Sequence, residues 1–308
     1  MKATREAYGE ELAKLVQENK KIVVLDADLA GSTKSIEAGK VAPERFFDMG
    51  IAEQNMIGVA AGLAASGYIP FASTFAMFAT GRCWEQIRNS VAYPHLNVKI
   101  VGSHSGITVG EDGCTHQAIE DIAIMRSIRG LAVFCPCDQY ETKAVIDYVA
   151  EYDGPCYVRL GRSKVEDFYT PYTKFDVTKV NVLRQGSQKI AVFATGLMVQ
   201  SSMTAAKILE KEGIDVTVVD VCAIQPCDMT GITQILSENE TIFTVEEHST
   251  TGGLGSMVAE IASEACPRFV HRIGMFGYAE SASAEVLLHE YQLDGEGVAA
   301  QIRGYLTK

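Results

Sequence analysis

The stretch that decides the fold is Phe47-Asp-Met-Gly-Ile-Ala-Glu-Gln-Asn-Met-Ile-Gly-Val-Ala-Ala-Gly-Leu-Ala-Ala-Ser-Gly67. Residues 52–66 within it are predicted to form a helix that is almost entirely apolar or small, and the carboxylate of Glu53 opens that helix. Burying a carboxylate is costly, so we expect Glu53 either to pair with a structural partner or to be kept protonated by desolvation. An acid catalyst needs the second state, and position alone favours neither.

Outward from this helix, short β-rich runs alternate with longer segments of helical period. Such alternation is typical of a largely parallel sheet with helices on both faces, so we predict an α/β fold. The predicted strands are residues 21–25, 98–101, 131–134, 156–160, 189–194, 215–219 and 241–245, and the predicted helices are residues 52–66, 84–90, 119–127, 140–152, 200–212 and 255–266.

Residues 163–187 interrupt the alternation, because they are polar, carry Pro171 and end near Gly186. The length of 308 residues also favours about two domains. We therefore expect a first, parallel-sheet domain at residues 1–170, a linker at residues 171–185 and a smaller α/β domain at residues 186–308.

The composition is that of an ordinary globular protein, with 47% hydrophobic and 21% charged residues. The net charge is −12 and no basic cluster occurs, so nucleic acid and anionic membranes are poor partners. The N-terminus lacks the apolar stretch of a signal peptide, and no later segment offers about 18 uninterrupted apolar residues, so we expect a cytoplasmic protein. The eight cysteines lack zinc or redox spacing and are expected to be buried as small hydrophobes.

Two strand ends carry candidate binding groups besides Glu53. Phe75 and Phe78 lie where a β-like run passes into a helix, and they share a helical face if the helix has begun. Two phenylalanines at this spacing are more often core than a platform for a cofactor. Arg159 and Arg162 follow another predicted strand, where a guanidinium could bind a phosphate or carboxylate or form a surface salt bridge.

A polar, glycine-rich stretch, residues 102–117, follows directly after a predicted strand. In an open α/β sheet this is where ligands bind, and the stretch holds four groups that can donate, accept or titrate: His104, Glu111, Asp112 and His116. Its Gly-Glu-Asp-Gly sequence suggests a site for a metal and a diphosphate, but no asparagine follows before the next strand. We therefore predict no metal ligands in this chain.

Four motifs, taken together and in order, resemble the pyrimidine-binding and C-terminal domains of transketolase, a thiamine-diphosphate enzyme. They are Gly50-Ile-Ala-Glu-Gln-Asn55, Ser73-Thr-Phe-Ala-Met-Phe78, Gly110-Glu-Asp-Gly-Cys-Thr-His-Gln117 and Val245-Glu-Glu-His-Ser-Thr-Thr-Gly-Gly-Leu-Gly255. A full-length transketolase begins with a domain whose Gly-Asp-Gly motif and asparagine hold magnesium and diphosphate, and that domain has no counterpart here. The resemblance implies the C-terminal subunit of a split, two-chain transketolase, whose N-terminal partner supplies this domain in an α2β2 assembly.

The resemblance also implies a cofactor, thiamine diphosphate with Mg²⁺, held mainly by the partner chain. Glu53 would hydrogen-bond a ring nitrogen of the aminopyrimidine and favour the tautomer that activates the thiazolium. Phe75 and Phe78 would sandwich the pyrimidine, and Asp28 would lie near the thiazolium. Many transketolases have a tyrosine where this chain has Gly81, so the pocket is expected to be more open or to be filled by the partner.

The implied reaction is transfer of a two-carbon ketol unit from a ketose phosphate to an aldose or aldose phosphate. His116 would move protons on the substrate hydroxyls, and Asp112 would bind the hydroxyl next to the carbonyl. The positions that match residues holding the sugar phosphate are His104, Arg5, Ser32 and one of Arg162 or Arg159, of which Arg162 is favoured.

Three alternatives share parts of this pattern. Deoxyxylulose-phosphate synthase has a similar Gly-x-Asp-Gly-x-Thr-His-Gln loop but typically lacks a counterpart of His104. The β subunit of 2-oxo-acid dehydrogenases is a separate chain of this size, yet it does not usually carry the Glu-Asp-Gly-Cys-Thr-His loop. A non-catalytic scaffold subunit would have no need of Glu53, Asp112 and His116 together.

Overall fold

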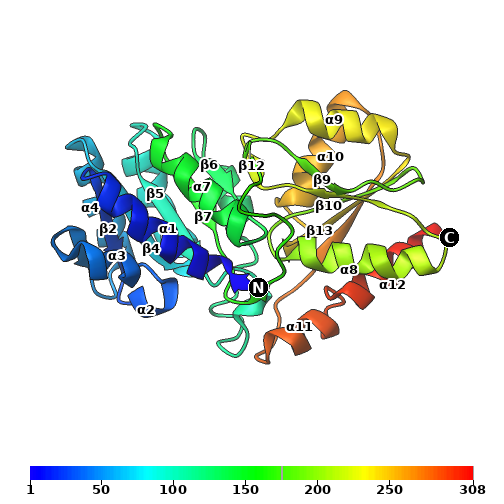
Figure 1. Ribbon diagram of the computed structural model, residues 1–308, viewed down its shortest axis with the longest axis horizontal. Coiled ribbons are helices and arrows are strands. Elements are labelled where there is room, and N and C mark those ends of the chain that lie inside the picture. Colours follow the sequence, from blue (N-terminus) through cyan, green and yellow to red (C-terminus); the bar gives the residue numbers. More distant parts are fainter. Residues whose placement is uncertain (175, 308) are drawn as a thin grey trace.

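Two largely parallel sheets, each between layers of helices, form the two halves of the molecule, shown as a computed structural model in Figure 1. The structure describes residues 1–174 and 176–307. Phe175 in the expected linker and Lys308 at the end of the expected second domain lie outside the described residues. The α/β class predicted from the alternation of strands and helices is confirmed.

The first sheet has the strand order β12-β6-β7-β5-β4-β2-β3, and every neighbouring pair is parallel except β12 with β6. Its central strands are buried along their length, which is why they read as continuous apolar runs. The strands are β2 (Ile22–Asp26), β3 (Phe46–Asp48), β4 (Ile69–Phe75), β5 (Lys99–Ser103), β6 (Ala132–Phe134), β7 (Cys156–Arg159) and β12 (Ala223–Gln225).

Helices cover both faces of this sheet. One face packs against α1 (Thr4–Glu18), α3 (Ile36–Val41) and α7 (Gln139–Glu151) through a single apolar cluster. The other face packs against α4 (Glu53–Ala65), α5 (Cys83–Gln86) and α6 (Asp121–Arg126). The short helix α2 (Ala30–Thr33) follows β2. The helix expected at residues 84–90 is only partly α-helical, because α5 continues as a π-helical segment, Ile87–Ala92.

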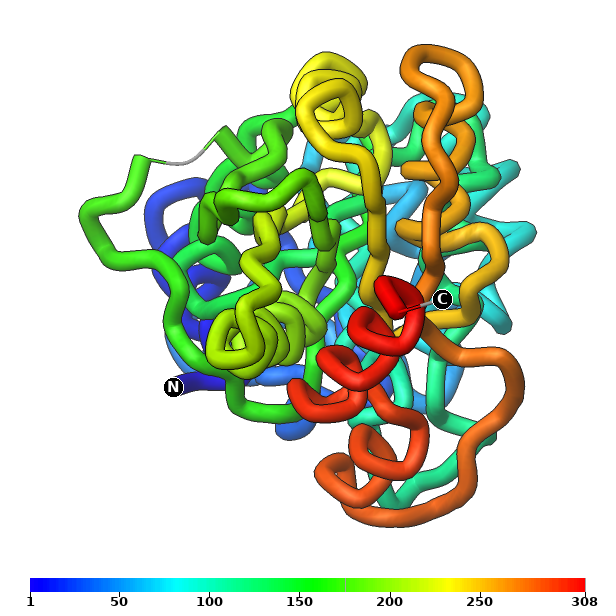
Figure 2. Tube along the Cα trace, turned by 90° about the vertical axis from the view of Figure 1, so that its right-hand side faces the viewer, coloured from blue at the N-terminus to red at the C-terminus, as the bar shows by residue number. Residues whose placement is uncertain are grey.

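The second sheet has the order β14-β13-β10-β11-β9. Its strands are β9 (Asn181–Arg184), β10 (Ile190–Ala194), β11 (Thr217–Asp220), β13 (Thr241–Ser249) and β14 (Val270–Met275). Its helices are α8 (Met198–Lys211), α9 (Met229–Glu238), α10 (Leu254–Ala265), α11 (Ala284–Glu290) and α12 (Gly295–Leu306). Figure 2, seen from the side of this half, shows α11 and α12 in front, at the end of a long connection from β14.

The two halves are joined more closely than a simple linker would allow. Strand β9 lies inside the segment 171–185 that was expected to connect the domains, and it pairs antiparallel with β11. Strand β12 comes from the second half of the chain but adds to the first sheet, and a short strand pair joins β1 (Lys2–Ala3) to β8 (Lys164–Val165). One hydrophobic cluster also runs from α4 and α6 to α9 and α10. The domains therefore share a core.

Among the described residues, no helix combines the length and the apolar character needed to cross a membrane.

Candidate functional site

The predicted site residues gather at the edge of the first sheet where its parallel strands end. Asp28 follows β2, Phe75 ends β4, His104 follows β5 and Arg162 lies shortly after β7. Parallel strands present their carboxyl ends at the same edge, so segments that are distant in the sequence meet there. Asp28 and His104 both adopt left-handed backbone conformations, with φ of 62° and 57°. Such conformations are costly for non-glycine residues and cluster at functional sites.

Glu53 is the first residue of α4, and its side chain is 6% exposed. Arg82 Nη1 donates a hydrogen bond to Glu53 Oε1 at 2.8 Å. Of the two states expected for this acid, the structure therefore contains the paired one, because the guanidinium compensates the buried carboxylate. The position in the first turn of a helix adds the favourable field of the helix dipole.

Phe75 and Phe78 do not share a helical face, because Phe75 ends β4 and Phe78 begins a π-helical turn, Phe78–Arg82. Their rings stack on each other, with centroids 5.8 Å apart and planes at 16°. A third ring between them would need roughly 7 Å, which is twice the van der Waals spacing of ~3.5 Å. The expected sandwich would therefore require the two rings to move apart. A pyrimidine can stack on an outer face of the pair, not between the two rings.

His104 is buried against Phe75, with ring centroids 3.9 Å apart, and its Nδ1 lies 2.9 Å from Ser103 Oγ. Burial, and then the charges of Arg5 and Arg162, lower the pKa of His104 to about 3. The ring is therefore neutral at pH 7, and it can both donate and accept a hydrogen bond.

His116 lies edge-on to Phe78, with centroids 5.1 Å apart, and its Nδ1 is 2.9 Å from Thr115 Oγ1. The structure thus brings His116 to the aromatic pair. Asp112, in the same loop, is exposed. An imidazole at the aromatic pair and an exposed carboxylate in the same loop offer hydrogen-bonding groups that suit a polyhydroxylated ligand.

The loop that carries Asp112 and His116 is held by the second domain. Glu247 Oε2, on β13, accepts hydrogen bonds from both the backbone N–H and the hydroxyl of Thr108, at 3.2 and 2.9 Å. The other two contacts are from Gln117 Nε2 to the Glu280 carbonyl, at 3.0 Å, and from the Ser281 hydroxyl to the Glu111 carbonyl. These three contacts with the second domain add to the hydrogen bonds that Arg162 of the first domain donates to Val109 and Glu111 in the same loop.

Arg5, Ser32 and Arg162 lie around a second part of the site. Arg5 Nη1 donates to the Ser32 carbonyl at 2.6 Å, and Arg162 Nη1 donates to Glu111 Oε2 at 2.9 Å. Both arginines line a cleft of about 830 Å³ between the two domains. Two guanidinium groups at one cleft suit an anionic group such as a phosphate.

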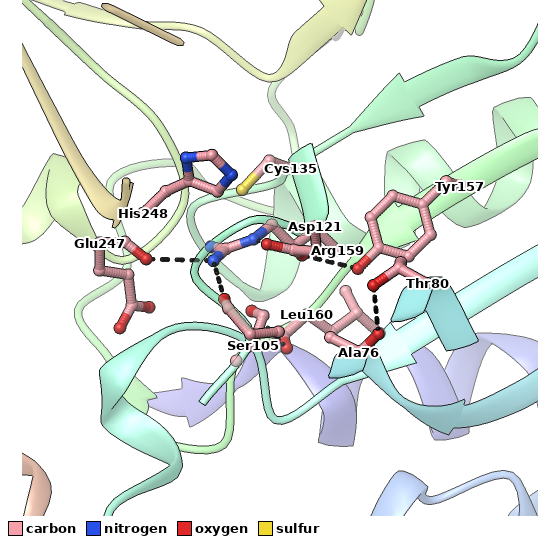
Figure 3. Close-up of polar contacts among 12 residues, drawn as sticks. Ala76, Thr80, Ser105, Asp121, Cys135, Tyr157, Arg159, Leu160, Glu247 and His248 are labelled. Atoms are coloured by element: carbon pink, nitrogen blue, oxygen red, sulfur yellow. Dashed lines mark hydrogen bonds and ion pairs between the residues drawn. The ribbon is translucent and has the colours of Figure 1, made fainter. Parts of the chain in front are cut away.

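Arg159 is not part of that cleft-lining pair, and Figure 3 shows where it lies instead. Its side chain is 3% exposed, and Nε donates to Asp121 Oδ2 at 2.8 Å. Nη2 donates to the carbonyls of Ala118 and Glu247, at 3.3 and 3.1 Å, while the Tyr157 hydroxyl also donates to Asp121, at 2.7 Å. Its Nε and Nη2 donors are engaged within the protein and link the site loop to β13, which favours Arg162 over Arg159 as the phosphate ligand.

Two residues of the site were missed by sequence reasoning. Asp26, fully buried at the end of β2, accepts hydrogen bonds from Leu29 N, Thr33 Oγ1 and Ser35 Oγ, and burial raises its pKa to about 6. It shapes the turn that carries Asp28 and Ser32, and an acid at a strand end followed by Thr and Ser could have indicated this. Arg82 has no comparable signal, because nothing in the sequence near it points to Glu53.

Among the described residues, side chains able to hold a metal ion gather at Cys137, Glu141 and Asp220. All three are buried where α7 meets the end of β11, and the Tyr169 hydroxyl donates to Asp220 at 2.7 Å. Burial raises the pKa values of the Cys137 thiol and the Glu141 carboxyl well above their ordinary values. Without a metal, burial therefore favours the protonated forms of these two groups.

The residues present do fit the aminopyrimidine of thiamine. That ring needs an aromatic face and an acid within reach of a ring nitrogen, and Phe78 and Glu53 offer both. The Arg82 guanidinium lies 4.0 Å from the centroid of Phe78 while it donates to Glu53, so one planar group can contact both at once.

Two family models match the chain: the transketolase pyrimidine-binding domain over residues 1–167 and the transketolase C-terminal domain over residues 178–298. A protein of Methanocaldococcus jannaschii, named as a transketolase C-terminal section, is 48% identical over 311 residues, which cover 100% of this chain and 97% of that protein. The 6-deoxy-6-sulfo-D-fructose transketolase subunit SqwH of Clostridium sp. (strain MSTE9) is 38% identical over 297 residues, covering 96% and 91% of the two chains.

A solved structure described as a split gene transketolase, inactive beta4 tetramer, matches with a TM-score of 0.92 and 47% identity, covering 100% of this chain and 99% of that one. The chain therefore belongs to the transketolase family, and over its whole length it matches the C-terminal subunit of a split transketolase.

Proposed function

We propose that this chain is one subunit of a thiamine-diphosphate-dependent transketolase, which transfers a two-carbon ketol unit from a ketose phosphate to an aldose or aldose phosphate. The observation that carries the proposal is the grouping of Glu53, Phe78 and His116 beside a cleft lined by Arg5 and Arg162. An acid, an aromatic face and a proton-transferring base adjoin an anion-binding cleft, as ketol transfer between sugar phosphates requires.

Each residue has a role that its surroundings allow. Thiamine diphosphate, when bound, supplies the nucleophilic carbon and stabilises the transferred unit. Glu53 would hold a proton at a pyrimidine nitrogen while Phe78 stacks on the ring, and Asp28 would lie toward the thiazolium. His116 would move protons at the substrate hydroxyls, and Asp112 would accept a hydrogen bond from the hydroxyl next to the carbonyl.

The phosphate of the sugar would be bound in the cleft. Arg5 and Arg162 would provide the positive charge, while Ser32 and the neutral ring of His104 would provide uncharged donors.

A partner chain completes the site in this proposal, because it would hold the diphosphate and Mg²⁺. In support, the split-gene relative is described as an inactive beta4 tetramer. An α2β2 assembly would pair two such sites. The SqwH relative is named for 6-deoxy-6-sulfo-D-fructose, so a sulfonated sugar is a second anionic substrate class to test with this chain.

The test is reconstitution with the chain that carries the diphosphate-binding domain. We expect the assembly, with thiamine diphosphate and Mg²⁺, to transfer ketol units between sugar phosphates, and we expect the isolated chain to bind the cofactor weakly by calorimetry. Glu53→Gln should assemble normally but lose exchange of the thiazolium C2 proton, measured by NMR. Near-normal exchange in that variant would refute the role of Glu53. Turnover of 2-oxo acids alone would favour a 2-oxo-acid dehydrogenase instead.

A further inference from the structure

Arg82 is the residue of this site that neither the motifs nor the proposed function uses. Its guanidinium stacks over Phe78 at 4.0 Å and donates to Glu53 Oε1 at 2.8 Å. Phe78 and Glu53 are the two residues that the proposed function assigns to the aminopyrimidine. A guanidinium is planar, delocalised and rich in N–H donors, so it satisfies an aromatic face and a carboxylate in the way that a protonated aminopyrimidine would.

We infer that Arg82 occupies the pyrimidine position of the cofactor-free subunit and must leave it when thiamine diphosphate binds. The inference rests on the proposed function, because it takes Glu53 and Phe78 as the pyrimidine contacts. Arg82 thereby sets the affinity for the cofactor: binding exchanges an internal ion pair and a cation–π contact for the contacts of the ring.

The local chain explains why Arg82 can take this place. The preceding residue, Gly81, has no side chain in the position where many transketolases have a tyrosine. The backbone of Arg82 is held, since Gln54 Nε2 donates to its carbonyl at 2.9 Å, but its side chain is 49% exposed. A fixed backbone with a half-exposed side chain allows the guanidinium to swing into solvent without unfolding the turn.

The cost of burying the Glu53 carboxylate explains why Arg82 pairs with it. Glu53 is almost fully buried, and a buried carboxylate with no partner is strongly destabilising. Arg82 supplies that partner as long as the cofactor is absent. Gly81 still lines a pocket of about 180 Å³, while the neighbouring Arg82 covers Phe78 and Glu53.

The experiment is calorimetric titration of thiamine diphosphate, at saturating Mg²⁺, into the complex reconstituted with the partner chain. Removing Arg82 removes the contacts that compete with the ring and leaves Glu53 in need of a donor. We expect the Kd of Arg82→Ala and Arg82→Gln to fall about tenfold, as the loss of one ion pair and one cation–π contact implies. Arg88→Ala is the matched control, because Arg88 is exposed on the following turn and bonds its neighbour Asn89; its Kd should not change.

An unchanged or higher Kd in both Arg82 variants overturns the inference, since Arg82 would then be a permanent partner of Glu53. Circular dichroism and co-elution with the partner chain check that each variant folds. If Arg82→Ala does not fold, the Kd of Arg82→Gln decides the question. Failure of the wild-type complex to bind the cofactor at all would refute the proposed function itself. Normal binding by the wild type without tightening in the variants would refute only the displacement of Arg82.

Discussion

Arg159 and Arg162 are close together in the sequence, but their side chains differ in burial and in the groups they contact. Arg159 is buried in an ion pair with Asp121, whereas the side chain of Arg162 is 41% exposed and lines the interdomain cleft. The Nε and Nη2 donors of Arg159 are engaged within the protein, while Arg162 can exchange the Glu111 carboxylate for a phosphate. We therefore expect Arg159 to contribute to the stability of the fold and Arg162 to contribute to phosphate binding. A variant of each residue serves as the control for the other.

For Arg162→Ala, we expect KM for a phosphorylated ketose to rise roughly tenfold or more, because a charge-assisted hydrogen bond is worth ~1.5–3 kcal/mol. The KM for an unphosphorylated ketose should stay nearly constant. Steady-state kinetics of the reconstituted complex with both donors measures the difference. Equal effects on the two donors would show that Arg162 does not bind the phosphate.

For Arg159→Ala, the expected effect is on folding instead. Removing one member of a buried pair leaves Asp121 charged and unpaired, so the free energy of unfolding should fall by ~3–5 kcal/mol. Urea denaturation of the purified chain measures this loss, with Arg162→Ala as the control that should change stability little. A loss of less than ~1 kcal/mol would mean that the Asp121 pair is not required.

At the scale of elements, the loop of residues 107–117 depends on a close approach between two domains. Gly106 has φ of 72°, and a Cβ atom there would lie 2.3 Å from the carboxylate of Glu247. The absence of a side chain is thus what lets Glu247 reach Thr108. Burial raises the pKa of Glu247 to about 7, and the two Thr108 hydrogen bonds oppose that rise.

Gly106→Ala should therefore release the loop from the second domain. We expect faster amide hydrogen exchange in peptides covering residues 107–117, read by mass spectrometry, since the displaced carboxylate would lose its contacts with Thr108. Gly130→Ala is the control, because Gly130 also has a positive φ, of 82°, but an added Cβ would meet no atom within 4 Å. Similar exchange in both variants would mean that backbone strain alone, not the Glu247 contact, controls the loop.

At the scale of the whole molecule, buried acids lie where the two domains meet. Burial raises the pKa of Asp220, on β11, to about 6 and that of Glu141, on α7, well above its ordinary value. Both acids bind protons more tightly in the folded state than in the unfolded chain, where their pKa values are about 4. Their contribution to stability is therefore fully present below about pH 4 and is lost as the pH rises through the folded values.

We therefore expect the free energy of unfolding to decline as the pH rises above about 4 and through the Asp220 pKa of about 6, by ~1–3 kcal/mol from this pair. Glu141→Gln cannot ionise, so its decline should be smaller than that of the wild type. Denaturation curves at several pH values test this, with Glu151→Gln as the control, because Glu151 is exposed at the end of the same helix. Parallel pH profiles for wild type and Glu141→Gln would exclude the pair as the cause.

Much of the architecture could be predicted because it is encoded locally. Hydrophobic period and strand composition placed most central strands and helices near their observed positions, and motif order indicated the family. Weakly patterned elements were missed: α1 offers few large apolar residues, and β9 is short and half-exposed within a polar segment. The register of β12 on the first sheet is likewise a long-range pairing that no local pattern reports.

By itself, the sequence determined which chemical groups this protein carries and at which strand and helix ends they lie, since period and spacing act over a few residues. Only the tertiary structure decided how those groups pair. It assigned Arg159 to Asp121 and left Arg162 at the cleft, stacked Phe75 directly on Phe78, and placed Arg82 against Glu53, 29 positions away in the chain. The physical reason is that a side chain's partner, burial and protonation depend on packing between elements, which no short stretch of sequence contains.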